Sequence, residues 1–167
     1  MSKVYGVMVG LVIDVNDPQK MGRVKLRFPW LSDDNESNWA RVATMMAGND
    51  RGSWFMPELD DEVLVAFEMG DTDHPFVVGF LWNGKDKPPQ TDTKVRLLKS
   101  LNGHEIELTD PAVSGGDKGH VRIRDAHGNT IELANGVINI TGVGTLQIKA
   151  PNVIINGRIV TPTPNPI

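Results

Sequence analysis

Acidic side chains are the first candidates for chemistry in this sequence, and their spacing decides what they can do. Asp60, Asp61 and Glu62 are adjacent. Neighbouring positions of a strand face opposite sides, so the three predict a strand-entry turn and not a pair of catalytic carboxylates. The sequence has no Gly-x-Ser-x-Gly, His-Glu-x-x-His or phosphate-loop motif and no cysteine. We therefore predict no catalytic residue and no enzyme.

Metal ligands are the second possibility. Asp14 and Asp17 flank an asparagine, but the spacing is not that of an EF-hand loop and a proline interrupts it, which favours a turn. His104, His120 and His127 could meet in a trimer, because threefold symmetry brings equivalent residues together. We predict no metal site and no cofactor, and an ion on a threefold axis stays open as an alternative.

Aromatic residues offer a third kind of site. Four tryptophans can in principle form a stacking platform for single-stranded nucleic acid: Trp30, Trp39, Trp54 and Trp82. Residues 1–90 hold nine Lys and Arg against 14 Asp and Glu, a net charge of −5, which argues against nucleic acid as a partner. Trp54, Phe55 and Met56 follow a Gly- and Asp-rich turn, so we predict that they form a partner-docking loop. Core packing is expected for the other three tryptophans.

Composition indicates short strands in one or two small domains. The chain has 167 residues, of which 40% are hydrophobic and 23% charged, and its formal charge is −4. Its 17 glycines and 11 prolines favour turns and short strands over long helices. No apolar run reaches the roughly 18 residues of a membrane span, and the start lacks a signal-peptide pattern. We expect synthesis in the cytoplasm without a signal peptide.

The first half, residues 1–83, predicts a five-stranded barrel of the OB type. Five segments are β-branched or alternate between apolar and polar residues, and turn-forming residues separate them: 7–15, 23–28, 39–44, 62–68 and 75–82. Residues 41–47 are the best candidate for a helix, and the pattern there is weak. Residues 84–94 are polar, contain a Pro-Pro pair and predict a linker.

The second half, residues 95–160, contains an internal repeat. Residues 95–108 align with 121–133, each copy reading as two short strands around a glycine turn. A degenerate third stretch has short alternating segments at 137–140, 145–149 and 153–155. Residues 161–167 form a separate proline-rich tip segment. The charged residues Glu105, Glu107 and Glu132 are expected to face solvent, opposite arginines of neighbouring strands.

Short hairpins bury little apolar surface by themselves, so something must cover the apolar face of this repeat. Alternation places eight residues on that face: Ile106, Leu108, Ile131, Leu133, Ile138, Ile140, Leu146 and Ile148. Copies of the chain around an axis would cover it, which predicts a homotrimer with these residues as its core. The alternative is a monomer in which residues 95–160 pack back on the barrel as extra strands.

Several motifs resemble a known family. The segments GRVKLRFPW (22–30), WARV (39–42), PELDDEVLVAF (57–67) and GDTDHPFVVG (70–79) resemble the OB domain of central spike proteins. These are the phage baseplate assembly protein V family and the type VI secretion spike, the valine-glycine repeat protein G. The Gly-turn and Ile-Glu-Leu repeats resemble the trimeric β-helix of that family, and together the resemblance covers about residues 1–155.

The resemblance implies an all-β protein, an OB-fold barrel followed by an intertwined trimeric β-helix or β-prism. It implies a structural spike of a contractile injection machine, in a phage tail baseplate or related particle, that docks on a separate baseplate hub protein. The trimer would act as a needle against the membrane of the target cell. Pro162, Pro164, Pro166 and Ile167 would form the tip or contact a small capping protein.

Two other functions are compatible with the residues. A monomeric OB-fold module that binds an oligonucleotide or a glycan is the main alternative. A wall-degrading enzyme is the other, and the lack of a catalytic constellation disfavours it.

Overall fold

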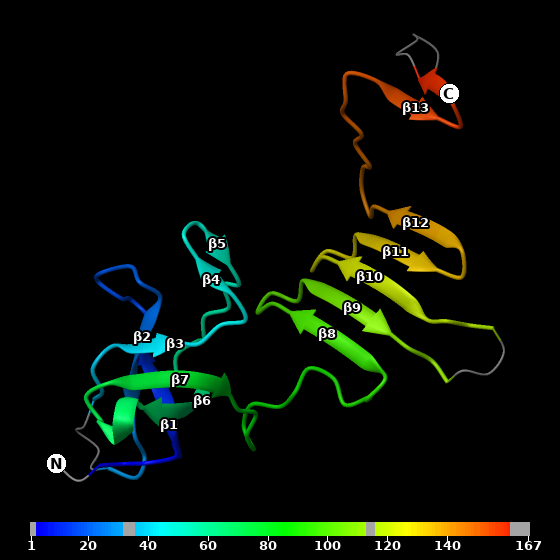
Figure 1. Ribbon diagram of the computed structural model, residues 1–167. Helices are drawn as coiled ribbons and strands as arrows, with labels where there is room; N and C mark the ends of the chain where they lie inside the picture. Colours follow the sequence, from blue (N-terminus) through cyan, green and yellow to red (C-terminus); the bar gives the residue numbers. More distant parts are fainter. Residues whose placement is uncertain (1–2, 32–35, 113–115, 161–167) are drawn as a thin grey trace. The chain divides into compact units, whose positions relative to one another are not determined.

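A computed structural model of the chain describes residues 3–31, 36–112 and 116–160 (Figure 1). The chain divides into two compact units, Met1–Pro88 and Pro89–Ile167. Both are built from strands, and the helical structure in the described ranges is the single turn η1 (Glu68–Gly70). This confirms the expectation of an all-β protein.

Five strands of the first unit close into a barrel: β1 (Val7–Asp14), β2 (Arg23–Arg27), β3 (Ala40–Val42), β6 (Glu62–Phe67) and β7 (Pro75–Phe80). Their order around the barrel is β1-β2-β3-β7-β6. Only β3 and β7 pair in parallel. A closed barrel of five short strands is consistent with the predicted OB fold.

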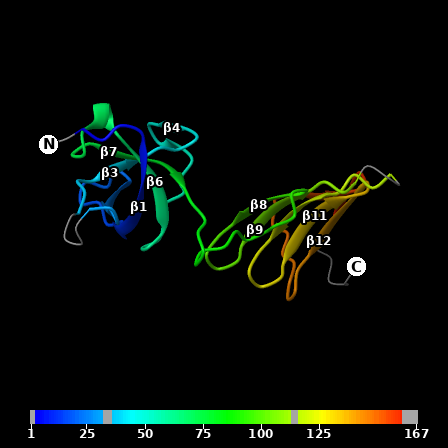
Figure 2. The ribbon, with the colours of Figure 1, turned by 90° about the horizontal axis from the view of Figure 1, so that it is seen from below.

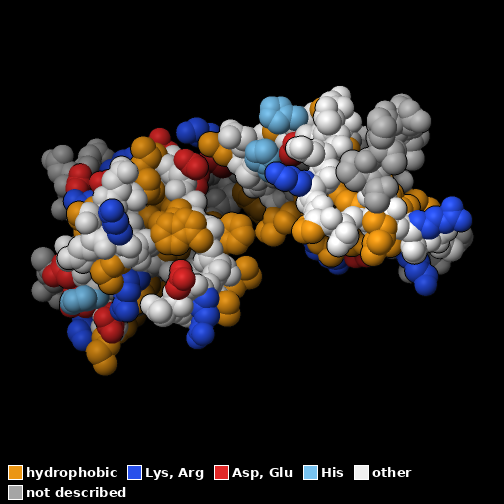
Figure 3. Space-filling model, turned by 90° about the horizontal axis from the view of Figure 1, so that it is seen from above, with side chains coloured by type: hydrophobic (Ala, Val, Ile, Leu, Met, Phe, Trp, Pro, Cys, Tyr) orange, Lys and Arg blue, Asp and Glu red, His pale blue; other side chains and the backbone are white. Residues whose placement is uncertain are grey.

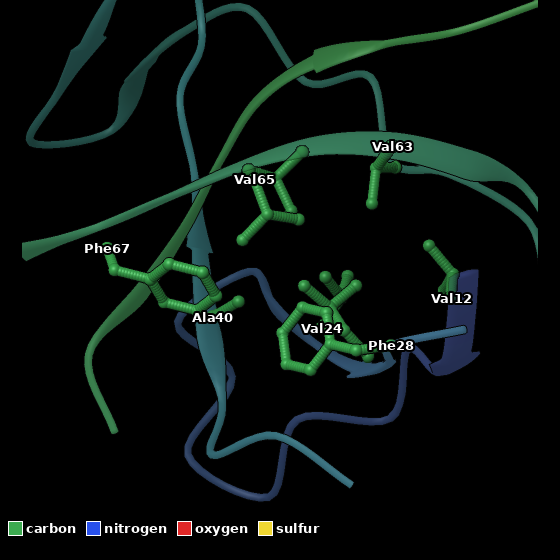
Figure 4. Packing of buried hydrophobic residues seen from close by; sticks show 9 residues of the cluster. Val12, Val24, Phe28, Ala40, Val63, Val65 and Phe67 are labelled. Atoms are coloured by element: carbon green, nitrogen blue, oxygen red, sulfur yellow. The ribbon is translucent and has the colours of Figure 1, made fainter. Parts of the chain in front are cut away.

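Alternate residues of these strands fill the barrel (Figure 4). Val12, Val24, Val63 and Val65 are fully buried, as are Leu26 and Val77. The ring of Phe28 packs edge-on against that of Phe67, with centroids 5.6 Å apart. The charged residues of β2 alternate with its buried valine and leucine, so this strand has one wet and one dry face.

The segment between β3 and β6 differs from the sequence-based expectation. The third predicted strand is shorter than expected, and the weak helix candidate at residues 41–47 forms no helix. The strand β4 (Ala47–Gly48) instead pairs with β5 (Arg51–Gly52) in a small hairpin. Arg41 is held in extended backbone by pairing with β7, and its guanidinium lies 4.3 Å from the ring centroid of Phe76. These pairings override the weak local helix preference.

The second unit contains a five-stranded antiparallel sheet in chain order: β8 (Val95–Lys99), β9 (Glu105–Thr109), β10 (His120–Arg124), β11 (Thr130–Ala134) and β12 (Val137–Thr141). A separate hairpin follows, β13 (Val153–Ile155) with β14 (Arg158–Val160). Figures 1 and 2 show β8, β9, β11 and β12 side by side. These strands form their own sheets and add none to the barrel.

Residues 145–149 are the one predicted strand of the repeat that belongs to no sheet in the described structure. The segment is exposed throughout. The predicted tip residues Pro162, Pro164, Pro166 and Ile167 lie outside the described residues.

Candidate functional site

The register of the second unit aligns its aliphatic residues into two rows across one face of the sheet. The first row contains the paired residues Leu98, Ile106, Ile123, Ile131 and Ile140. The second row contains Arg96, Leu108, Val121, Leu133 and Ile138. We call this surface the apolar face. Six of the eight predicted trimer-core residues lie on it.

The nine aliphatic side chains of the apolar face are exposed, with exposed fractions between 41% and 67%. Figure 3 shows hydrophobic side chains reaching the surface of both units. The other two predicted core residues, Leu146 and Ile148, lie in the unpaired segment 145–149 and are 56% and 65% exposed. The structure therefore does not bring these two to the sheet of their own chain.

The opposite face of the sheet is polar and joined by ion pairs. Arg122 donates from Nε to Glu132 Oε2 at 2.8 Å, and its Nη1 lies 3.5 Å from Glu107 Oε1. The Nε2 atom of His120 lies 2.8 Å from the same Glu107 oxygen. The cross-strand register places Arg122 directly opposite both Glu107 and Glu132, which confirms the expected pairing of glutamates with arginines.

Glu105 departs from the expectation of a solvent-facing side chain. Lys99 Nζ lies 2.7 Å from its Oε1 and Arg124 Nη2 donates to its Oε2 at 2.6 Å, so the residue is only 9% exposed. These two cations, Lys99 first, hold the pKa of Glu105 below its usual value. The long side chains of the two cations cover the carboxylate, and alternation by itself did not predict this.

The exposure of the two faces is the reverse of that in an ordinary solvated sheet, because the polar face is partly covered and the apolar face is exposed. In β11 the polar positions Thr130 and Glu132 are half-buried, whereas Ile131 and Leu133 are exposed. The same inversion occurs in β9 and β10. A solvated sheet normally buries its apolar face, and a contiguous apolar surface marks an interaction site. A face of this composition is suited to association with another apolar surface.

The predicted docking loop of the first unit forms a second candidate surface. Trp54 and Phe55 are 73% and 58% exposed, whereas Met56 is half-buried and packs against the barrel core. All three residues line the same hollow, and Met56 forms its inner side. The hollow has a volume of about 500 Å³ and is also lined by two methionines that sequence analysis missed, Met21 and Met46. Met21 and Met46 come from different loops, so no local motif identified them.

Two local contacts hold this surface in shape. The indole ring of Trp54 covers Gly22, where a Cβ atom would lie only 2.8 Å from Cζ3. Gly22 also has a φ of +70°, which favours glycine. In the second loop, Thr44 Oγ1 donates to the Ser53 carbonyl at 2.7 Å. An exposed aromatic side chain is therefore presented in a fixed orientation.

Asp17 organises the turn that carries Met21. Its carboxylate accepts the backbone N–H groups of Gln19 and Met21 and pairs with Arg23, whose Nη2 lies 2.7 Å away. Arg23, followed by these backbone donors, holds the pKa of Asp17 far below its usual value. A carboxylate satisfied in this way is a structural turn element, in agreement with the preference for a turn over a Ca²⁺ site. In the described residues, no three acidic or histidine side chains are grouped to hold a metal ion.

The remaining tryptophans do not all pack in the core. Trp82 is 70% exposed and Trp30 is 42% exposed, so the expectation that they pack in the core was wrong. Both lie at the ends of strands, where the barrel narrows and a ring extends past the core. Trp39 is half-buried, with Lys25 Nζ 5.8 Å from its ring centroid.

The described parts of the chain contain no helix long and apolar enough to cross a membrane.

Comparison with known proteins identifies a family for the barrel and several relatives of the chain. Residues 8–82 match the family described as the type VI secretion system/phage-baseplate injector OB domain. The type VI secretion system spike protein VgrG5 of Pseudomonas aeruginosa is 35% identical over 111 residues, which is 64% of this chain and 13% of that protein. VgrG3 of Vibrio cholerae is 31% identical over 113 residues, 62% of this chain and 11% of that protein.

A third spike protein, VgrG2a of Pseudomonas aeruginosa, is 28% identical over 131 residues, 76% of this chain and 14% of that protein. The chain thus spans between a tenth and a sixth of the length of these relatives. These relatives are named as spike proteins, which supports the prediction of a non-enzymatic chain. The barrel is thus similar to the injector OB domain shared by phage baseplates and type VI secretion systems, and the chain is similar to type VI secretion spike proteins.

Proposed function

We propose that the chain is the central spike of a contractile injection machine, such as a phage tail baseplate, and that it works as a homotrimer. Three copies place their apolar faces against a common threefold axis and leave the ion-paired faces outside. The second unit is then a β-helix or β-prism, and residues 161–167 form its tip or contact a capping protein. The trimer acts on the membrane of another cell.

The single observation that carries this proposal is the inverted exposure of the two sheet faces. Nine aliphatic residues lie in register on the exposed side, where the one charged residue, Arg96, is paired with Asp110, while the glutamates of the other face are paired with cations. Covering the apolar face gains hydrophobic free energy without burying an unpaired charge. Spike proteins among the relatives support the same reading.

The barrel has a separate role in the proposal. Trp54 and Phe55, with Met21 and Met46 beside them, dock on a baseplate hub protein. Exposed aromatic side chains held in place lose little conformational entropy on binding, and methionines adapt to the partner surface. Met56 supports this surface from beneath by packing on the core.

A matched pair of substitutions on β12 tests the trimer. Ile140 lies on the apolar face and is 55% exposed, whereas its neighbour Asn139 lies on the opposite face, across from Glu132. We expect I140K to convert the trimer into monomers, because it places three ammonium groups on the axis. N139K should remain a trimer in light scattering. If both variants remained trimers, the apolar face would not be the trimer interface.

The main alternative, a monomeric OB module that binds an oligonucleotide or a glycan, has no specific support in the geometry. The strand β2 is basic on its outer side, but Arg23 is committed to Asp17 and Lys25 to Glu36.

A further inference from the structure

Four asparagines of this chain are followed directly by glycine: Asn83, Asn102, Asn135 and Asn156. Because glycine has no side chain, its backbone nitrogen can approach the Cγ atom of the asparagine before it. A bond from that nitrogen to Cγ forms, the bond from Cγ to Nδ2 breaks, and the proton of the glycine nitrogen leaves with the amide nitrogen as ammonia. Water then opens the resulting succinimide to aspartate or isoaspartate. The reaction needs no enzyme and no cofactor.

The structure shields the first of these asparagines at its side chain. The Oδ1 atom of Asn83 accepts the backbone N–H groups of Lys85 and Asp86 at 2.8 and 2.7 Å. Its Nδ2 atom donates to Glu62 Oε2 at 3.3 Å and to Asp86 Oδ2 at 3.1 Å. The side-chain amide is fixed at both ends, so its Cγ atom can turn toward the glycine nitrogen only if these hydrogen bonds break.

Asn102 is shielded at the attacking atom instead. The backbone N–H of Gly103 donates to the carbonyl of Ser100 at 3.0 Å, within the turn between β8 and β9. The backbone N–H of Ser100 donates to the carbonyl of His104 at 2.9 Å and closes the same turn. The nitrogen that must lose its proton is therefore already engaged, and Asn102 reacts only after this turn opens.

Asn135 and Asn156 occupy two tight hairpin turns of the second unit. The φ values are +51° and +78° at Asn135 and Gly136, and they are +50° and +77° at Asn156 and Gly157. Two successive residues with positive φ are typical of the type I′ turn. All four residues are exposed, and within the described ranges neither glycine N–H nor either asparagine side chain has a hydrogen-bond partner. The closed turn still fixes the asparagine backbone, so each asparagine reacts when its hairpin opens.

The strands on either side decide how often each turn opens. The turn at Asn135 joins β11 to β12, which are paired at five positions, and β11 is paired at five more with β10. The turn at Asn156 joins β13 to β14, which are paired at three positions and form a sheet of their own. Ile154, Ile155 and Ile159 of this hairpin are between 58% and 63% exposed. An isolated two-stranded hairpin is only marginally stable in water, so the turn at Asn156 opens far more often.

We infer that Asn156 is a site of spontaneous modification, converted to aspartate or isoaspartate while the hairpin of β13 and β14 is uncovered. Isoaspartate carries the former side-chain carbon in the backbone, so it lengthens a two-residue turn and disturbs the pairing of Val153 with Val160. Either product also adds a carboxylate to residues 133–167, which otherwise contain no Asp or Glu. One further step rests on the trimer proposed above: assembly covers the hairpin and keeps it closed, so the conversion is confined to unassembled copies.

Peptide mapping of the full chain after incubation at mildly alkaline pH tests the inference. The I140K chain serves as the unassembled form, and mass spectrometry detects the exchange of NH₂ for OH at each site. Each rate is divided by that of a synthetic peptide with the same flanking residues, such as 152–160 for Asn156 and 132–139 for Asn135. This ratio removes the effect of local sequence and leaves the effect of the fold.

We expect Asn156 in I140K to convert within about tenfold of its peptide rate, because its hairpin is marginally stable. The other three asparagines should be slowed at least about tenfold more, which corresponds to about 1.4 kcal/mol in the free energy of opening. N156Q is the control, because a glutamine would have to close a larger ring. It should abolish conversion at this position and leave the other three rates unchanged.

Equal slowing of Asn156 and Asn135 in I140K would overturn the inference, because the small hairpin would then be as firmly closed as the large sheet. Faster conversion at Asn83 or Asn102 would overturn it as well. The wild-type chain separates the inference from the proposed trimer. A trimeric wild-type chain that converts Asn156 as fast as I140K would refute the protection by assembly. A monomeric wild-type chain would refute the trimer, and the order of the four rates in it would test the modification site directly.

Discussion

Truncating a single isoleucine in the middle of the apolar face distinguishes a trimer core from an exposed sheet. Ile131 is 41% exposed in the chain by itself, and its neighbours across the strands are Ile123 and Ile140. Full burial of such a side chain contributes about 1.5–3 kcal/mol, so covering the remaining two fifths adds roughly 0.6–1.2 kcal/mol per copy. Inside a packed trimer, I131A also leaves a cavity.

The expected loss of unfolding free energy is therefore about 2–4 kcal/mol per copy, or roughly 6–12 kcal/mol per trimer. In a lone sheet the same substitution removes only the contacts already made, about 1 kcal/mol. The assay is urea unfolding by circular dichroism at several protein concentrations, because the stability of a trimer depends on concentration. T130A, on the polar face of the same strand, is the control and should lose about 1 kcal/mol or less.

The reasoning would be refuted if the urea midpoint did not change with protein concentration and the two variants lost similar free energies. That result would mean that the apolar face is uncovered in solution.

Three further predictions concern the carboxylates and the docking surface. Because the pKa of Asp17 is depressed in the folded barrel, its ionised form stabilises the fold above an unfolded pKa of about 4, and this stabilisation is lost as the pH falls. The melting temperature of D17N should therefore decline less between about pH 5 and pH 2 than that of the wild-type chain. The pKa of Glu105 is depressed by Lys99 and Arg124, so E105Q should likewise flatten the acid limb, but for the unfolding of the second unit. A Cβ at Gly22 collides with the ring of Trp54, so G22A should cost about 1–2 kcal/mol of barrel stability, shift the tryptophan fluorescence and weaken hub binding. G84A is the control, because its Cβ would have open space around it, and it should change none of these three properties.

The sequence predicted the barrel strands best where buried and exposed residues alternate strictly. The segment Arg23–Arg27 is such a case, although the irregularity in its pairing with β1 between Val12 and Asp14 was not predictable from that alternation. The short β3 and the hairpin of β4 and β5 were harder, because two- and three-residue strands are defined by their partners and not by their own pattern. The strand β14 was missed for the same reason.

The candidate sites divide in a similar way. The apolar face was predictable because the Ile-Glu-Leu repeat has the period of a strand, which sorts Ile131 and Leu133 from Glu132 without any knowledge of the partner strands. The burial of Glu105 was not predictable, because Lys99 and Arg124, which cover its carboxylate, reach it from two other strands. Met21 and Met46 were missed because a surface assembled from two loops leaves no local motif.

The failure at residues 145–149 has a different cause. The alternation there is as clear as in β12, but a backbone hydrogen bond from Val143 to a side chain 14 residues earlier diverts the chain. A periodic pattern shows that a segment suits a sheet and does not show which sheet it joins.

The native mass of the full chain, measured by light scattering after size exclusion, tests the central claim most directly. Three copies of an 18.3 kDa chain give about 55 kDa, and this mass should persist on dilution to the micromolar range. A mass of 18.3 kDa at all concentrations would mean that the apolar face has no second copy upon it, and it would contradict the spike account.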